Sequence, residues 1–143
     1  MDAIDYIVSD FEMLGDWDQR YQYLVELGES LPEMPAALHN EENRVKACMS
    51  KVWVAAYPDP GNPGHIRFHG DCDTPIIKGV VGLLVQLFSG LTPKQVLKLD
   101  VDHLFERIRL GENLSPNRHF GVYAVVDQMK AQAERLAGAP VAA

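Results

Sequence analysis

Apolar residues recur every three or four positions near the amino terminus, which is the pattern of helices with one buried face. The first such helix is predicted over residues 4–14, and Gly15 ends it. Asp16 begins a second helix, because its carboxylate can accept hydrogen bonds from first-turn N–H groups. Gln19 follows three residues later, and we expect it to reach back to the cap as in a capping box. Two prolines within residues 31–37 then forbid a continuous helix and predict an extended stretch.

The middle of the chain changes to the pattern of a β-hairpin. Valine and aromatic residues between positions 45 and 57 favour a pleated strand. Residues 58–64 contain three prolines and two glycines, and they predict a loop. In the second strand Ile66 and Phe68 alternate with polar neighbours, and we expect residues 70–73 to make the turn into the next helix.

The remainder of the chain is predicted to be helical. Three helices start at a hydroxyl residue followed by proline, which suits the N-cap and the first helical position: Thr74-Pro75, Thr92-Pro93 and Ser115-Pro116. The helix after Pro75 is apolar almost all round, so we expect it at the centre of the fold. Asp100 is expected to cap a shorter helix through Arg109 that stops at Gly111. The last helix is predicted over residues 116–136.

Length and composition describe one domain. The chain has 143 residues, of which 47% are hydrophobic and 23% are charged, which suits a single core. We place the domain at residues 1–137 and expect residues 138–143 to form a flexible tail. The net charge of −7 disfavours nucleic acid as a partner. The longest apolar run, residues 79–85, is far below the ~20 residues that span a membrane. Because no basic leader is present either, we expect a cytoplasmic protein that does not bind membranes.

Cys48 lies where the chain enters the first predicted strand, in a basic part of the sequence. Arg44, Lys46 and Lys51 surround it, and no acidic residue lies between positions 43 and 58. Nearby cations lower the pKa of a thiol and favour the nucleophilic thiolate. The alternative is a small core cysteine, because free cysteine is among the most buried residue types.

A second cluster contains residue types that bind metals. His65 and His69 lie four positions apart in the predicted strand and therefore face one side, followed by Cys72 and Asp73. These donor atoms suit zinc or iron, but a closed site needs about four ligands in a fixed geometry. We therefore expect no metal here and place the histidines on a solvent-facing side of the hairpin. The two cysteines of the chain are also too few for a disulfide scaffold or an all-cysteine zinc site.

Arg118 stands in the first turn of the last predicted helix, where a cation opposes the helix dipole. Two interpretations stay open: a structural salt bridge, or the binding of an anionic group or partner. The tryptophans, Trp17 and Trp53, are most simply core residues. No glycine-rich phosphate loop, Ser-His-Asp arrangement or HExxH motif is present, so ordinary hydrolases and nucleotide enzymes lack support.

Five blocks of residues, spread along nearly the whole chain, match one family in order and spacing. They are Leu27-Gly28 with Leu31-Pro32; Asn43 with Cys48-x-Ser50-x-Val52-Trp53; Gly70-Asp71-Cys72-Asp73 with Ile76 to Gly79; Leu91-Thr92-Pro93; and Leu114-Ser115-Pro116-Asn117-Arg118. On these residues the sequence resembles the SufE family, sulfur-acceptor proteins that work with cysteine desulfurases in iron–sulfur cluster assembly. Ala47 departs from the family, which usually has glycine before the cysteine, and Met49 and Lys51 replace glutamines. Cys72 stands where a serine or another small residue is usual.

The resemblance implies an α+β fold with a small, mainly antiparallel sheet flanked by helices, as in the cluster-scaffold proteins of the NifU and IscU type. The hairpin and helices predicted from the pattern agree with this fold. A third strand is expected from residues 38–45, although the pattern there does not predict one by itself.

The resemblance also implies that Cys48 accepts persulfide sulfur from a cysteine desulfurase and carries it covalently toward cluster assembly. We expect the chain to activate the desulfurase rather than to be an enzyme. It should need no resident cofactor, with pyridoxal phosphate (PLP) on the desulfurase. The expected partners are a desulfurase of the SufS or CsdA type and a downstream scaffold such as SufBCD. The sequence does not separate SufE from its relative CsdE, and a homodimer stays open.

We expect the surroundings of Cys48 to form the docking surface, because its thiol must reach a cysteine on another protein. The residues expected to offer positive charge to an acidic partner surface are Arg44, Lys46 and Lys51. Two further docking positions, implied by the resemblance, are Asp73 and Arg118. The apolar neighbours expected to shelter the bound sulfur are Val45, Met49 and Trp53.

Two other classes of function stay open. A metal or iron–sulfur scaffold protein would bind its metal through several thiolates, and this chain has only two cysteines. A thiol redox sensor would use Cys48 and Cys72 as attacking and resolving thiols. Sulfur carriage, metal binding and disulfide formation change the mass of the protein differently, so mass measurements separate them.

Overall fold

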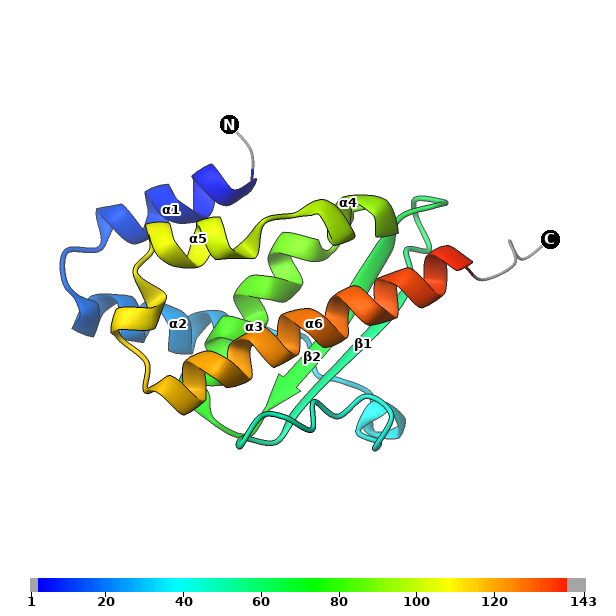
Figure 1. Ribbon diagram of the computed structural model, residues 1–143, viewed down its shortest axis with the longest axis horizontal. Coiled ribbons are helices and arrows are strands. Elements are labelled where there is room, and N and C mark those ends of the chain that lie inside the picture. Colours follow the sequence, from blue (N-terminus) through cyan, green and yellow to red (C-terminus); the bar gives the residue numbers. More distant parts are fainter. Residues whose placement is uncertain (1–2, 139–143) are drawn as a thin grey trace.

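The computed structural model describes residues 3–138 and has an α+β fold, in which helices surround a two-stranded sheet (Figure 1). The helices are α1 (Ala3–Met13), α2 (Trp17–Glu29), α3 (Pro75–Phe88), α4 (Pro93–Lys98), α5 (Val101–Arg107) and α6 (Pro116–Gly138). The strands are β1 (Val52–Pro58) and β2 (Ile66–Cys72), and the 3-10 helices are η1 (Ala36–Leu38) and η2 (Leu110–Glu112). The predicted fold class is confirmed.

The helices begin where their capping residues predict. Asp16 accepts a hydrogen bond from the N–H of Gln19 at 3.0 Å. The amide oxygen of Gln19, however, accepts the N–H of Gly15 rather than that of Asp16, so the predicted capping box is shifted by one residue. Thr92 and Gln95 form a complete capping box at the start of α4.

Two helix ends differ from the prediction. α5 ends at Arg107, and Arg109 adopts a left-handed conformation with φ of 59° before η2 begins. α6 continues through Gly138, so the first residue of the expected tail is helical. The rest of that expected tail, residues 139–143, lies outside the described residues.

The two strands form the predicted antiparallel hairpin. Val52 pairs with Cys72 at one end, and Pro58 pairs with Ile66 at the other. The turn expected at residues 70–73 is wrong, because residues 70–72 complete β2 through their pairing with β1. β1 also begins later than predicted, since the chain just before Val52 forms a loop.

The third strand expected over residues 38–45 does not form within the described part of the chain. This segment contains the end of η1 and a turn, and it touches β1 at one isolated bridge between Arg44 and Trp53. The free edge of β1 therefore needs other hydrogen-bond partners, because unpaired backbone groups are costly when buried.

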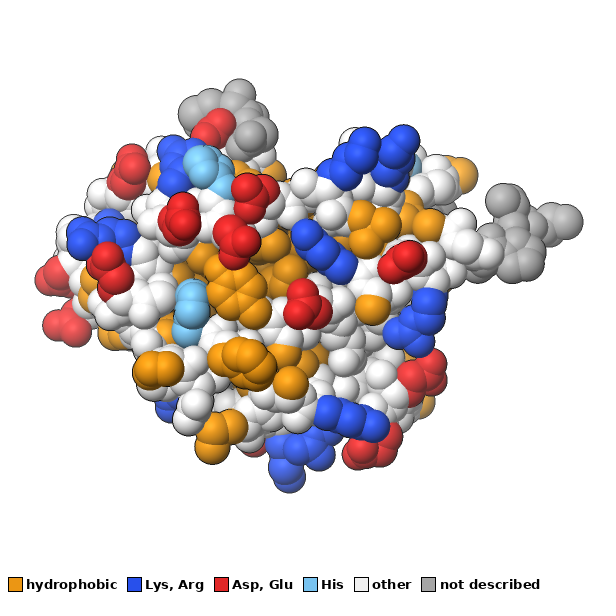
Figure 2. Space-filling model, in the orientation of Figure 1, with side chains coloured by type: hydrophobic (Ala, Val, Ile, Leu, Met, Phe, Trp, Pro, Cys, Tyr) orange, Lys and Arg blue, Asp and Glu red, His pale blue; other side chains and the backbone are white. Residues whose placement is uncertain are grey.

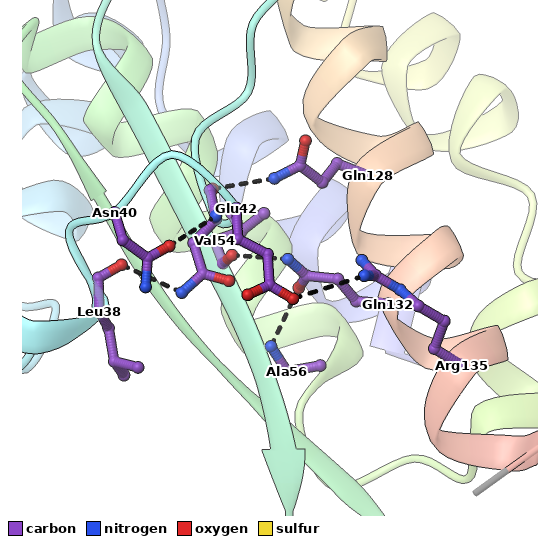
Figure 3. A network of polar contacts seen from close by, with 9 residues as sticks. Leu38, Asn40, Glu42, Val54, Ala56, Gln128, Gln132 and Arg135 are labelled. Carbon is purple, nitrogen blue, oxygen red and sulfur yellow. Dashed lines mark hydrogen bonds and ion pairs between the residues drawn. The ribbon is translucent and has the colours of Figure 1, made fainter.

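Backbone from the turn and Gln132 of α6 supply those partners, and Gln128 of α6 binds the turn itself (Figure 3). The N–H of Val54 donates to the carbonyl of Asn43 at 3.0 Å, and Gln128 donates to the same carbonyl at 2.8 Å. Gln132 donates to the carbonyl of Val54 at 2.7 Å and accepts from the N–H of Ala56 at 3.0 Å. The turn backbone and the Gln132 side chain of α6 thus complete the edge of β1 in place of a third strand.

Helix α3 is buried at the centre of the fold, as predicted, and packs on α2 and β2. At the crossing with α2, a Cβ on Gly79 would lie 2.1 Å from the carbonyl oxygen of Leu24, so glycine is required there for the close approach. α6 crosses over α3 and the strands (Figure 1). This crossing brings the first turns of α6 beside the end of the hairpin where β1 begins. No helix within residues 3–138 is both long and apolar enough to cross a bilayer.

Candidate functional site

Cys48 lies in the middle of a loop, residues 46–50, that we call the Cys48 loop. The loop is fastened at its first end by the N–H of Val45, which donates to the carbonyl of Val52 at 2.8 Å. The N–H of Cys48 in turn donates to the carbonyl of Val45 at 3.4 Å. Val45 is buried, so this end of the loop is held in the core.

The second end of the Cys48 loop is fastened to the segment that follows β2. Lys51 donates its N–H to the carboxylate of Asp73 at 3.0 Å, and Asp73 donates its N–H to the carbonyl of Lys51 at 3.1 Å. The hydroxyl groups of Ser50 and Thr74 are hydrogen-bonded at 2.8 Å. The Thr74 hydroxyl is therefore bonded to the Cys48 loop, and it makes no hydrogen bond that caps α3.

The Cys48 thiol is half-buried and lies between helix α6 and a cavity. On the helix side, a Cβ on Gly121 would lie only 2.8 Å from the Cys48 Sγ. The cavity beside the thiol has a volume of about 400 Å³. It is bounded by the Cys48 loop, the start of α3 and the first turn of α6, and its lining includes Asp73, Ile77 and Arg118.

The structure divides the predicted docking residues into two groups. Asp73 and Arg118 line the same cavity as Cys48, although they lie far apart in the sequence. Arg44 and Lys46 line a separate groove of about 550 Å³ between the loop and α6, and Cys48 does not line that groove. The Lys51 side chain is exposed where the loop ends. The basic residues therefore flank the loop and do not gather around the thiol.

Arg118 has no ion pair with any other residue of the described chain, and its side chain is exposed. The interpretation of Arg118 as part of a structural salt bridge is therefore wrong within residues 3–138. An unpaired guanidinium beside the cavity of Cys48 is available to an anionic group or to a partner.

The predicted shelter for the sulfur is only partly present. Val45 is buried, but the Met49 side chain is 83% exposed and cannot cover the thiol. Trp53 is half-buried and lies edge-on to His39, with ring centroids 4.9 Å apart. The residues that do cover Cys48 include Ile77 at the start of α3 and Gly121 in α6.

Sequence reasoning missed Gly121 and the start of α3 as parts of this site. Gly121 lies three positions after Arg118 in α6, so both belong to one side of that helix. That spacing is the only signal in the sequence that connects Gly121 to the site, and it does not indicate which loop packs there.

Cys72 occupies a different environment from Cys48. It is the last residue of β2, its side chain is 6% exposed, and its Sγ accepts the N–H of Thr74. Burial raises the pKa of Cys72 to about 11, and the negative charges of Asp73, Cys48 and Asp71 add to the increase, while the Thr74 hydrogen bond opposes it. Burial is therefore a larger cause of the raised pKa than the neighbouring aspartates.

Comparison with known proteins identifies the family. Residues 5–133 match the family model of SufE, described as an Fe-S metabolism associated domain. The chain belongs to the SufE family. It is 37% identical over 141 residues to an uncharacterized SufE-like protein of Rhizobium etli, a match that covers 97% of this chain and 95% of the relative. A SufE-like protein of Rhizobium meliloti, also uncharacterized, is 35% identical over 136 residues, covering 94% of this chain and 96% of the relative.

A solved structure agrees with the fold of this SufE-family chain. The solution structure of a hypothetical protein from Thermus thermophilus superposes with a TM-score of 0.78 at 24% sequence identity. The match covers 95% of this chain and 96% of the other. Membership in the SufE family associates the chain with iron–sulfur metabolism and sulfur transfer, and implies association with a cysteine desulfurase.

The cluster of possible metal ligands in this SufE-family chain is used in other ways. His65 is hydrogen-bonded to the carbonyl of Gly90 at 2.7 Å. His69 stacks on Tyr57 with ring centroids 4.5 Å apart, and burial lowers the pKa of His69. Within residues 3–138, no three His, Cys, Asp or Glu side chains are grouped so that they can hold a metal ion.

Proposed function

We propose that the chain accepts sulfur on Cys48 from the persulfide of a cysteine desulfurase and passes it on for iron–sulfur cluster assembly. The observation that carries this proposal is the placement of Cys48, whose thiol borders a cavity on a short loop. Cys72 is buried, so it is the poorer nucleophile of the two cysteines. Membership in the SufE family supports a role in iron–sulfur metabolism.

The transfer step is a thiol–disulfide type of exchange. The Cys48 thiolate attacks the outer sulfur of the desulfurase persulfide, and a new S–S bond forms to Cys48. The S–S bond within the desulfurase breaks, and its cysteine leaves as a thiolate with the electron pair of that bond. No external oxidant or reductant is needed, because one S–S bond replaces another. The cavity beside Cys48 has room for the added sulfur atom.

In this proposal the chain is a covalent carrier and an activator, not an enzyme. Removing the outer sulfur frees the desulfurase cysteine for its next turnover. The chain itself carries no resident cofactor, and PLP belongs to the desulfurase. A downstream scaffold of the SufBCD type receives the sulfur, and the exchange takes place in the cytoplasm.

The desulfurase docks around the Cys48 loop. Lys46 and Lys51 have exposed side chains on either side of Cys48, and Arg44 lies half-buried in the adjoining groove. Arg118 offers an unpaired positive charge beside the cavity. These cations favour an acidic partner surface and speed the encounter through long-range attraction. Asp73 adds no positive charge. Its carboxylate accepts a hydrogen bond from the N–H of Lys51 and so fastens one end of the Cys48 loop.

The test combines intact mass and desulfurase turnover. With a cysteine desulfurase, cysteine and a reductant, sulfide release should rise on adding the native chain and should not rise on adding Cys48→Ser. Without reductant, the native chain should gain one sulfur atom on the Cys48 peptide. Cys72→Ser is the matched control and should load as the native chain does. Sulfur carried by Cys48→Ser, together with none on Cys72→Ser, would show that the assigned site is wrong.

A redox sensor is the second candidate function, and one observation favours it. Negative charge on Cys48 contributes to the raised pKa of Cys72, so the two thiols are close enough to influence each other. Peroxide treatment should then produce an internal disulfide, seen as the loss of two hydrogen atoms in intact mass and as a peptide joining both cysteines. Sulfur gain on Cys48 without that disulfide supports the carrier.

A further inference from the structure

We infer that Gly121 is a positioning residue for sulfur transfer, because the missing side chain at this position lets the Cys48 loop close against helix α6. The inference rests on the proposed function of Cys48. It adds the feature that holds the thiol in place between encounters with other proteins.

The contact between Gly121 and Cys48 is unusually close. A Cβ on Gly121 would lie 2.8 Å from the Cys48 Sγ, 3.5 Å from its Cβ and 3.6 Å from its Cα. Nonbonded heavy atoms do not pack at 2.8 Å from a carbon in protein interiors, since that is well inside van der Waals contact. All three of the nearest atoms belong to Cys48, so the thiol occupies the space that a side chain at position 121 would fill.

The backbone of α6 gives no other reason for glycine at this position. Gly121 lies inside a long helix, where alanine is intrinsically more favourable than glycine. The described glycines with positive φ are Gly64 and Gly90, so Gly121 does not need the conformational freedom that glycine offers. The close approach of Cys48 is therefore the feature that requires glycine.

This contact defines a closed state of the Cys48 loop. The loop is fastened at Val45 and at Lys51, and the residues between these points can leave α6 without breaking either fastening. In the closed state α6 covers one side of the Sγ, and a reagent or partner must approach through the cavity. Cys48 therefore reacts more slowly in the closed state than in the open one, and its observed reactivity rises with the open fraction.

Gly121→Ala should shift the loop toward the open state and make Cys48 more reactive. The matched control is Gly138→Ala, the same substitution in the same helix at a position where no atom of residues 3–138 outside this helix would lie within 4 Å of the new Cβ. Timed alkylation with iodoacetamide, read by peptide mass, should be about tenfold faster at Cys48 in Gly121→Ala, as expected when an open minor state becomes the main one. The control should match the native chain. Cys72 reports global unfolding in every sample and should stay slow.

A double-mutant cycle tests the contact without any reagent. In a Cys48→Ala background the Sγ is gone, so Gly121→Ala should raise the midpoint of thermal unfolding through its better helix propensity. In the native background the same substitution should raise the midpoint less, or lower it. Equal shifts in both backgrounds, or equal alkylation of Cys48 in the native chain and Gly121→Ala, would overturn the role of Gly121.

The consequence for sulfur transfer is measured separately. Gly121→Ala should take sulfur from the desulfurase faster than the native chain does and should also lose it faster to an added thiol. In that loss the thiol attacks the outer sulfur, a new persulfide forms on the thiol, and Cys48 leaves as thiolate. Failure of the native chain to load sulfur would overturn the proposed function alone, because alkylation and the double-mutant cycle do not depend on it.

Discussion

Cys48 and Cys72 lie at the same end of the hairpin, yet the structure treats the two thiols differently. Cys48 precedes β1 on a loop that is fastened only at its ends, and its Sγ borders a cavity. Cys72 ends β2, pairs with Val52 and faces the core. The strand fixes the backbone of Cys72 through its pairing with β1, whereas the backbone N–H of Cys48 bonds to the carbonyl of Val45 at the first end of its own loop.

The difference bears on the reactivity of the two thiols. Burial disfavours the charged form of a thiol, so the strand position suppresses the thiolate of Cys72. A loop position avoids that cost but exposes the sulfur to every reductant in solution. At Cys48, the compromise is a thiol that rests against Gly121 and faces a cavity.

The largest expected effect is a difference in alkylation between the two cysteines of the native chain. The pKa of Cys72 is about 11, and its ordinary value is 9.0. Two pKa units reduce the thiolate at neutral pH by roughly 100-fold. We therefore expect Cys72 to be alkylated roughly 100-fold more slowly than a thiol of ordinary pKa, and Cys48 to react first, in timed alkylation at about pH 7. Equal rates in the folded protein would remove the contrast between the two positions.

The second prediction concerns stability at alkaline pH. Because the folded pKa of Cys72 lies above the unfolded one, its contribution to stability is complete below pH 9.0 and is lost as the pH rises toward 11. Two pKa units correspond to roughly 2 to 3 kcal/mol in the free energy of unfolding. Urea unfolding gives the free energy of unfolding of the native chain and of Cys72→Ala at pH 8 and at pH 11. Between these two pH values the native chain should lose more stability than Cys72→Ala does.

Cys48→Ala is the control for the alkaline measurement, and a reductant prevents oxidation in all samples. Cys48→Ala should keep most of the pH dependence of the native chain, because burial is the largest cause of the raised pKa of Cys72. If Cys72→Ala instead loses stability between pH 8 and pH 11 as steeply as the native chain, ionisation of Cys72 does not oppose folding.

The smallest expected effect is on docking. Lys51→Glu reverses an exposed charge beside the Cys48 loop and leaves its backbone hydrogen bonds with Asp73 in place. We expect about a fivefold loss of affinity for the desulfurase, equivalent to ~1 kcal/mol, and a weaker loss at high salt. Lys94→Glu, on exposed α4 at the opposite end of the molecule (Figure 1), is the control. Equal losses for both variants would mean that only net charge matters.

The helices and the hairpin could be predicted because their signals are local. Asp16 caps α2, Thr92 caps α4, and residues 59–65 separate the two strands, one residue later than the loop expected at residues 58–64. The prediction of a third strand was wrong because Gln132 completes the edge of β1. Gln132 lies far along the chain, and the sequence around it does not have the pattern of a strand. A polar residue within a helix gives no sign that it will bind a strand.

The candidate site was predictable in part for the same reason. Cys48 and its charged neighbours can be read from one stretch of sequence, and Asp73 and Arg118 entered through the resemblance. The contact with Gly121 depends on how α6 crosses the hairpin, which no local pattern describes. The arrangement of charge is visible only on the folded surface, and the face in Figure 2 shows acidic and basic side chains around an apolar area near its centre.

The two fastened ends of the Cys48 loop also limit how far Cys48 can move from the rest of the domain. Cys48 is three residues from both Val45 and Lys51, and a fully extended chain spans at most about 3.6 Å per residue. Even when completely open, the loop can carry the Cys48 backbone only about 11 Å from either fastening. Cys48 cannot contact a partner cysteine that lies deeper below the partner's surface than this distance plus the length of one side chain. Under the proposed function, the desulfurase therefore has a shallow entrance, or brings its own persulfide outward to meet the loop.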